Sequence, residues 1–269
     1  RSRGLGDVYK RQLMILLYIP PVQNLLRREV TAYASKATGM QIQVERIDLR
    51  FPLNLLVRGV EVIQQPDTLL SLESLNVRVQ AWPLVKGKVE VDEVTLSQVA
   101  FNSANLIEGM KIKGVLGRFF LQSHGVDLSN ELAVINQTEL SDTHVQMLMN
   151  DTTTTPKDTT ASAPVNWKVD LHKLKLKNVS FSMQLPADSM RMAAHIGEAF
   201  INDAQADLKN QFYELKQFLL SGSSANYDTG AAKPGEGFDA SHIAVRDIRI
   251  GLDSFCLLYT SPSPRDRSL

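Results

Sequence analysis

The feature that most constrains the fold is an eight-residue pattern, h-x-h-x-x-h-x-h, in which h is apolar. Each half alternates with period two, which places its apolar side chains on one face of a β-strand. A bulge or bend that absorbs one extra residue returns the second half to that face and increases the local twist. The pattern therefore predicts a mainly β protein with a long, curved, one-sided sheet. Six copies of the pattern lie at Ile42, Val44, Ile47, Leu49; Leu55, Val57, Val60, Val62; Leu70, Leu72, Leu75, Val77; Val89, Val91, Val94, Leu96; Val169, Leu171, Leu174, Leu176; and Ile243, Val245, Ile248, Ile250.

The intervals between these instances are irregular, which argues against a solenoid of fixed period. Four further segments are predicted to be strands. For the third of them, Ala-rich helical spacing makes a short helix the alternative. The four segments are Val126–Val134, Val145–Met149, Met190–Ile201 and Phe212–Leu220.

Two polar segments are predicted loops. Residues 150–166, "NDTTTTPKDTTASAPVN", have too few apolar residues to bury a core, so we expect a disordered loop. This loop would separate a first sheet region, residues 40–149, from a second, residues 167–255. Residues 221–237, "SGSSANYDTGAAKPGEG", are predicted to form a second long loop.

The two ends of the chain are related through their DNA. "DVYKRQ" at residues 7–12 can be encoded by DNA whose complementary strand, read one base out of frame, encodes "CLLYTS" at residues 256–261. The nucleotide string resembles a transposon-derived sequencing adaptor. We therefore interpret residues 1–12 and 256–269 as translated adaptor and exclude them from fold reasoning.

The first residues after the adaptor, Leu13, Met14, Ile15, Leu16, Leu17, Tyr18 and Ile19, are all apolar. Seven residues are too few to span a bilayer, which takes about 20. The run adjoins the adaptor, and we interpret it as the truncated end of a membrane anchor; a buried strand and a signal-peptide core are the alternatives. An amphipathic helix is predicted to follow up to residue 38, with Pro21 in its first turn and Gly39 as its C-terminal stop.

Charge and composition argue against several classes of function. Subtracting the six basic and two acidic residues of the adaptor segments from the 29 of each sign leaves a net charge of about −4, without a basic block that would suit nucleic acid. The single cysteine, Cys256, lies in the adaptor. The five histidines are dispersed, without the spacing of a metal site. The sequence thus predicts no catalytic residue, metal or cofactor, and we expect a protein that is not an enzyme.

An apolar sheet face must be shielded from water, and the sequence is compatible with three kinds of cover. The sheet could pack on a second sheet, curl into an elongated groove that holds acyl chains, or lie against another protein. If the sheet forms a groove, the repeated apolar positions given above are the candidates that line it.

The segments "YIPPVQNLL", "ATGMQIQVERIDLRFPLNLLVRGVEV" and "DTLLSLESLNVRV…AWPLVKGKVEVDEVTLSQVAFN" resemble the N-terminal region of TamB translocation and assembly module proteins, in the AsmA-like group, especially members from Bacteroidota. The resemblance covers residues 13–102 best and continues more loosely to residue 255. It implies a single-pass inner-membrane anchor, with the bulk of the protein in the periplasm as a β-taco, a curled sheet with an apolar concave face.

The resemblance also implies a role in the bacterial envelope. The expected function is a bridge that carries phospholipid to the outer membrane, with an Omp85-type barrel as a partner of a C-terminal region absent here. The alternative that stays open is a scaffold for the assembly of outer-membrane proteins through a barrel partner. A surface β-sandwich adhesin, with a cleaved signal at Leu13, is a weaker third interpretation.

Overall fold

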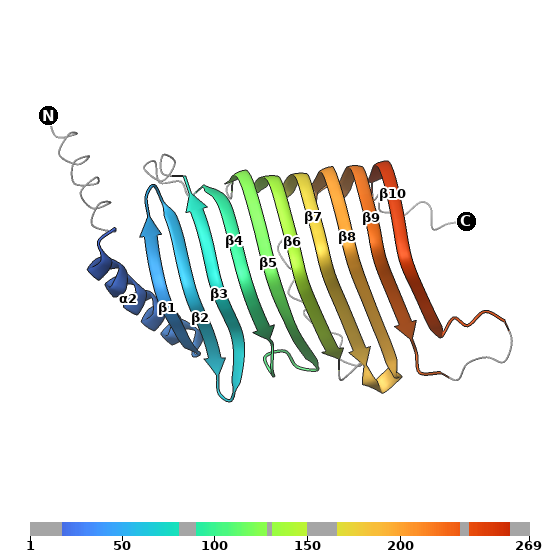
Figure 1. Ribbon diagram of the computed structural model, residues 1–269, viewed down its shortest axis with the longest axis horizontal. Helices are drawn as coiled ribbons and strands as arrows, with labels where there is room; N and C mark the ends of the chain where they lie inside the picture. Colours follow the sequence, from blue (N-terminus) through green and yellow to red (C-terminus); the bar gives the residue numbers. More distant parts are fainter. Residues whose placement is uncertain (1–17, 81–89, 128–130, 150–165, 232–236, 259–269) are drawn as a thin grey trace, which may run out of the picture.

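A computed structural model describes residues 18–80, 90–127, 131–149, 166–231 and 237–258 of the 269-residue chain (Figure 1). Within these residues the protein is mainly β, with one N-terminal α-helix and one long, curved, unclosed sheet, as the sequence predicted. In chain order the elements are α2 (Pro20–Thr38), β1 (Gln41–Arg50), β2 (Asn54–Gln64), β3 (Asp67–Val79), β4 (Val91–Asn102), β5 (Met110–Asp127), β6 (Leu132–Met149), β7 (Lys168–Leu185), the 3-10 turn η1 (Pro186–Asp188), β8 (Met190–Asp207), β9 (Phe212–Asp228) and β10 (His242–Leu258).

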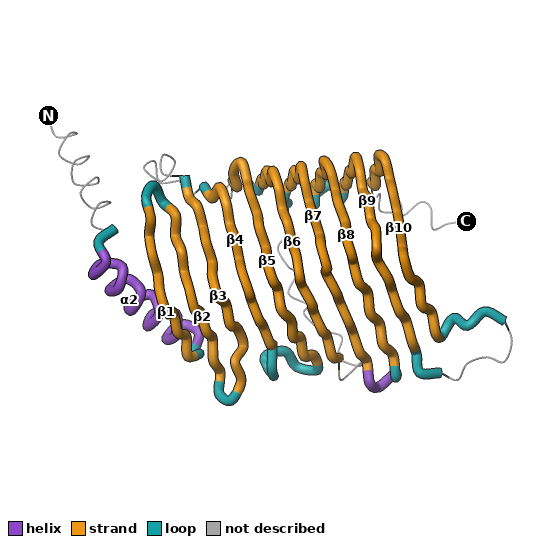
Figure 2. Tube along the Cα trace, viewed as in Figure 1, coloured by secondary structure: helices purple, strands orange, loops and turns teal. Residues whose placement is uncertain are grey.

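The described strands form a single sheet in which spatial order follows chain order from β1 to β10 (Figure 2). Neighbouring strands are antiparallel except β6 and β7, which are parallel. The end of β6 and the start of β7 therefore lie at opposite ends of these two strands, so the connection must run the length of the strands. The loop expected over residues 150–166 lies between these two strands, and all of it except Asn166 is outside the described residues.

Helix α2 lies along β1 at one edge of the sheet (Figure 1). It has proline in its first turn and ends at Gly39, which has a left-handed φ of 69° and donates its N–H to Ser35 O at 3.0 Å. Its polar side chains bind the free backbone edge of β1. Gln23 Nε2 donates to Leu49 O at 3.0 Å, and Arg27 Nη1 donates to Val44 O at 2.9 Å.

The sheet has no second layer among the described residues, and few side chains are deeply buried. The buried apolar side chains are Leu53, Leu69, Leu72, Ala133, Leu185 and Ala199. The protein is therefore held together by its backbone ladders and by side-chain contacts between neighbouring strands rather than by a closed core.

Two predicted segments are wrong. The strand predicted over Val126–Val134 is a reversal, because β5 ends at Asp127 and the antiparallel β6 begins at Leu132. The intervening sequence, "LSNE" at residues 128–131, includes Ser and Asn, which favour turns. The loop predicted from Ser221 to Gly237 is also wrong in its first part, because β9 continues to Asp228. The Ala-rich segment that begins at Met190 is a strand, as favoured from sequence.

The end segments fall mostly outside the described residues. Residues 1–17, which include Leu13 to Leu17 of the predicted anchor, and residues 259–269 are not described. Of the predicted anchor, only Tyr18 and Ile19 are described, and they form the turn before α2. Strand β10 continues past Phe255 through Leu258, and we base no functional argument on those last three residues.

Candidate functional site: the apolar face of the sheet

The apolar positions of successive strands form rows that run across the sheet. Directly paired residues on neighbouring strands place their side chains on the same face. Val44 pairs with Val60, which pairs with Leu72 in one such row. One row crosses all ten described strands through Ile47, Val57, Leu75, Leu96, Phe119, Leu140, Leu176, Ala199, Leu220 and Ile250.

The groove candidates predicted from the eight-residue pattern all lie on this face where they are described. Val89 lies outside the described residues. The remaining candidates pair with one another or with apolar residues that the pattern did not include, such as Phe119 and Ile201, except Ile248, which pairs with Ser223. Sequence analysis missed these additional residues for two reasons. Strand β5 lacks a full copy of the pattern, and the copies in β8 (AHIGEAFI, residues 194–201) and β9 (YELKQFLL, residues 213–220) are not among the six given above.

Residues without ladder partners form a line across the strands, which we call the first crease. On β1, β2 and β3 this line passes through one of the two residues between the apolar pairs of the pattern. Val44 pairs with Val60 and Arg46 with Arg58, so Glu45 and Gly59 lie opposite each other without a ladder pair. The same gap recurs at one level of every strand from β1 to β9. Its residues are Glu45, Gly59, Glu73, Gln98, Gly117, Asp142, Asn178, Gly197 and Gly222.

Backbone conformation at the first crease explains how one extra residue is absorbed. Gly59 has φ of 58°, and Asp142 and Asn178 have φ of 52° and 53°. This left-handed region is open to glycine and is tolerated best among other residues by Asn and Asp. Asn178 Nδ2 donates to Asp142 Oδ1 at 2.7 Å between the parallel strands β6 and β7. Because every strand takes its extra residue at the same level, both halves keep their apolar side chains on one face.

A second crease crosses the strands from β7 to β10 through His172, Asp203, Lys216 and Ser254, which also lack ladder pairs. The copy of the pattern at Val169 to Leu176 spans this second crease, whereas the copy at Ile42 to Leu49 spans the first. Copies of one sequence pattern therefore serve two separate bends of the sheet.

Exposure shows that the two faces differ in curvature. Leu72, on the apolar face of β3, exposes 7% of its surface, although no second layer covers it among the described residues. On the opposite face, Val115 exposes 51% and Leu219 exposes 45%; on the apolar face, similar exposure occurs at the end strand β10, where Val245 exposes 45% and Ile250 exposes 41%. Side chains converge on the concave side of a bent sheet and diverge on the convex side. The apolar face is therefore the concave one.

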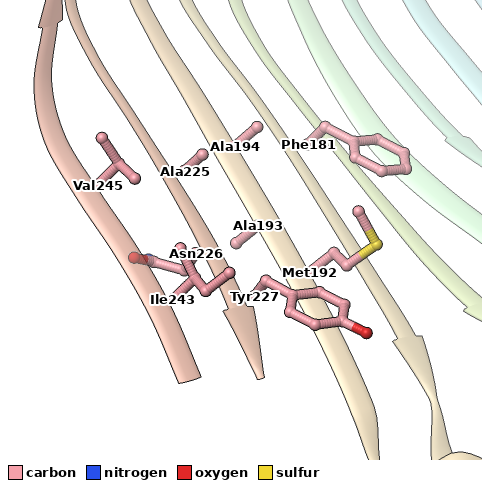
Figure 3. A pocket seen from close by; sticks show the side chains of 9 residues that line it. All are labelled: Phe181, Met192, Ala193, Ala194, Ala225, Asn226, Tyr227, Ile243 and Val245. Carbon is pink, nitrogen blue, oxygen red and sulfur yellow. The ribbon is translucent and has the colours of Figure 1, made fainter. Parts of the chain in front are cut away.

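A pocket of about 170 Å³ lies on this concave face near one end of strands β7 to β10. Figure 3 shows Phe181, Met192 and Tyr227 along one side and Ile243 and Val245 along the other, with small alanine side chains between them. Ala194 and Ala225 are paired neighbours in a row that has Phe181 on one flank and Val245 on the other. An engineered apolar cavity of about 150 Å³ binds benzene, so the pocket suits a small piece of hydrocarbon.

The polar residues in the apolar rows are satisfied locally. Thr143 and Ser223 are buried on this face near the first crease. Thr143 Oγ1 donates to Ser141 O at 3.2 Å, and Ser223 Oγ donates to Ser221 O at 3.1 Å. Because each hydroxyl binds its own strand, neither presents an unsatisfied donor to an apolar ligand.

Charged groups gather on exposed positions away from the apolar rows. His172 Nδ1 lies 3.1 Å from Asp203 Oδ1, and Lys216 Nζ lies 3.5 Å from Asp203 Oδ2. The hydrogen bond from His172 and the charge of Lys216 lower the pKa of the Asp203 carboxyl below its ordinary value. The pKa of Asp207 is also lowered, chiefly by the backbone N–H of Asn210. These exposed ion pairs contribute little to stability.

The described residues contain neither a cluster of metal ligands nor a membrane-spanning helix. No group of three or more His, Cys, Asp or Glu side chains in the described ranges is arranged to hold a metal ion. Within those ranges, α2 is too polar to cross a bilayer, and no other helix there has the length and hydropathy to do so.

The fold and its apolar face define a class: a mainly β protein built on one open, curved sheet, with an apolar concave side that no other described element covers. No family model matches the chain, and the comparison with curated proteins found no match.

Proposed function

We propose that this chain is a non-enzymatic envelope protein whose concave sheet face carries the acyl chains of phospholipids. The observation that supports this proposal most directly is the set of apolar rows that cross every described strand without a covering layer. A surface of this kind gains about 0.8 kcal/mol for each methylene group that it removes from water. Acyl chains are the commonest cellular ligand that offers only methylene groups.

The repetition of the rows suits movement as well as binding. Within a row, neighbouring strands present similar aliphatic side chains, for example Val57, Leu75 and Leu96 on β2, β3 and β4. A hydrocarbon chain that shifts from one strand to the next exchanges one set of apolar contacts for an equivalent set. The binding energy therefore changes little along the row, which is the condition for sliding without a deep trap.

The cellular setting of the proposal rests on the resemblance to TamB-like proteins. Within that setting, the apolar run at Leu13 to Ile19 would be the end of an inner-membrane anchor, and the sheet would lie in the periplasm as part of a phospholipid bridge to the outer membrane. The concave face would then be the path along which phospholipid moves away from the inner membrane.

Lipid retention tests the proposal. The double substitution Val91→Asp and Leu96→Asp places two carboxylates on the apolar face of β4. We expect the variant to lose bound phospholipid, as measured by native mass spectrometry after mild extraction. The matched control is Val115→Asp with Leu219→Asp, which adds the same charges to apolar residues on the convex face. Circular dichroism and thermal unfolding establish that both variants stay folded. Wild-type protein free of lipid, or equal lipid in the two variants, would refute the proposal.

One observation favours a second candidate, a scaffold that helps outer-membrane proteins to assemble. Within the described residues, β10 forms a ladder only with β9, so its other edge is open to a further strand. Photo-crosslinking groups at Arg246 and Arg249 of β10 would report a barrel strand that pairs there. Crosslinks to a barrel protein, together with lipid-free wild-type protein, would favour the scaffold over lipid transport.

A further inference from the structure

The rotation of α2 about its axis is fixed by its polar side. Gln23, Arg27, Thr31 and Ser35 are spaced four residues apart and so lie along one side of the helix. Two of them donate to carbonyl groups of β1, as described above, and Ser35 Oγ accepts the backbone N–H of Ile42 at 3.1 Å. Three hydrogen bonds, made by Gln23, Arg27 and Ser35, hold this side against the strand edge, whereas the buried hydroxyl of Thr31 has no hydrogen-bond partner among the described residues.

The consequence is a helix with its apolar side turned outward. Leu25 and Tyr33 lie two residues from members of the polar stripe, and two residues along a helix is nearly half a turn. Leu25 exposes 56% of its surface and Tyr33 exposes 76%; Val30, which lies next to Tyr33 three residues earlier in the helix, exposes 47%. An ordinary surface helix buries its apolar stripe against its own protein. In α2 the polar stripe contacts the edge of β1, and the apolar side has no partner among the described residues.

Aromatic exposure continues at the start of the helix. Phe51, in the turn between β1 and β2, exposes 85% of its surface. Its ring centroid lies 6.4 Å from that of Tyr18, whose hydroxyl donates to Pro52 O at 2.7 Å. Aromatic rings with one polar end are favoured at the boundary between a membrane and water. The apolar run "LMILLYI" directly precedes this point in the sequence.

We propose that the outward side of α2, formed by Leu25, Val30 and Tyr33, lies in the headgroup region of a lipid bilayer. Arg28 and Lys36 supply cations near this side, and Glu29, between Leu25 and Tyr33, is the one acidic residue of the helix. The preference of such a surface is for anionic lipid, because the two cations outnumber the carboxylate. A stripe of three large apolar side chains is small for a protein interface, which uses about 20–30 residues on each side.

This inference is independent of the proposed lipid path, because it concerns the outer side of α2 rather than the concave sheet face. Its geometry has one implication for that path. A helix bound in the plane of the membrane would hold the β1 end of the sheet beside the bilayer, so that the apolar rows begin where lipids are available.

Flotation with vesicles tests the inference on the full chain. Wild-type protein is expected to float with vesicles of phosphatidylcholine and phosphatidylglycerol, and less well with phosphatidylcholine alone. Leu25→Asp with Tyr33→Asp should lower the vesicle-bound fraction about tenfold or more, since each apolar side chain contributes roughly 1.5–3 kcal/mol when buried. The control Val115→Asp with Leu219→Asp adds equal charge at similarly exposed apolar positions and should bind as wild type does. Glu29→Gln should strengthen binding to the anionic vesicles.

A depth measurement separates α2 from the residues that precede it. Tryptophan placed by Tyr33→Trp should be quenched by lipids brominated on their acyl chains, whereas tryptophan placed by Leu219→Trp should not. Equal flotation of the Leu25→Asp, Tyr33→Asp variant and the wild type, or no quenching of the Tyr33→Trp protein, would overturn the inference. A wild type that ignores vesicles but dimerises through α2 would assign this side to a second copy instead. Lipid retention on the concave face should be unchanged by the α2 substitutions, so each proposal can fail without the other.

Discussion

The close approach of strands β8 and β9 at the first crease makes Gly197 a sensitive position. A Cβ atom added there would lie 2.5 Å from the backbone oxygen of Gly222 and 3.0 Å from the backbone oxygen of Ser221. The obstructing atoms belong to the neighbouring backbone, so no side chain can rotate away to relieve the contact. Gly197→Ala is therefore expected to push the two strands apart and to lower the free energy of unfolding by about 2–3 kcal/mol, near the upper end for overpacking.

A matched control is available on β10, which lies on the other side of β9 from β8. A Cβ atom at Gly251 of β10 would meet only Leu219 Cδ2, at the ordinary contact distance of 3.6 Å. Gly251→Ala is expected to be neutral or to stabilise the protein by up to about 1 kcal/mol, because alanine restricts the unfolded chain. Urea unfolding followed by circular dichroism gives both free energies, and the two variants differ from the wild type by the same single methyl group.

The comparison of the two alanines decides whether the crease is a tight structural feature. A difference of about 2 kcal/mol or more between them would agree with the close backbone approach. Equal stabilities would refute the reasoning, since they would mean that β8 and β9 separate at Gly197 without cost. A loss of lipid retention in Gly197→Ala at a temperature where it stays folded would further connect the bend to the shape of the concave face.

Three further outcomes are expected from other parts of the molecule. Leu72→Ala should cost about 2 kcal/mol or more in thermal or urea unfolding, because it empties one of the most buried positions on the concave face. Arg27→Ala should leave the carbonyl of Val44 without its donor and cost about 1 kcal/mol, with faster amide exchange in β1. NMR titration should give Asp203 a pKa below its ordinary value, and His172→Ala should raise it. Because that pKa is lowered on folding, its small stabilising effect is complete at neutral pH and is lost as the pH falls through the folded-state pKa.

The eight-residue pattern predicted the curved sheet because two residues between apolar pairs break the period of a flat strand. Glycine, Asn and Asp at the second of these two positions were an available signal for the crease, as at Gly59 and Asp247, which both have a positive φ. The pattern could not show that two separate creases exist. That distinction depends on how the strands are shifted along one another, and register is a property of pairs of strands rather than of any one strand.

The two incorrect segments have local causes. The stretch from Val126 to Val134 is apolar at both ends, which resembles a strand, but the turn-forming residues at its centre separate two strands. The stretch that begins at Ser221 looks like a loop because it is rich in Ser and Gly, but Gly222 is needed at the crease, where its φ is 59°. Its neighbour Ser223 is buried, with its hydroxyl bound to its own strand. Composition alone cannot separate a flexible loop from a bent strand that requires small residues.

The sequence by itself determined that the chain forms strands with one apolar side, because alternation along a strand is a local property that each segment carries alone. It also located α2 and its end at Gly39. Only the tertiary structure decided that the apolar side is concave, that β6 and β7 are parallel, and that α2 turns its polar side toward the sheet. These features depend on the positions of neighbouring strands and on the free backbone groups of β1, which a helical wheel does not contain.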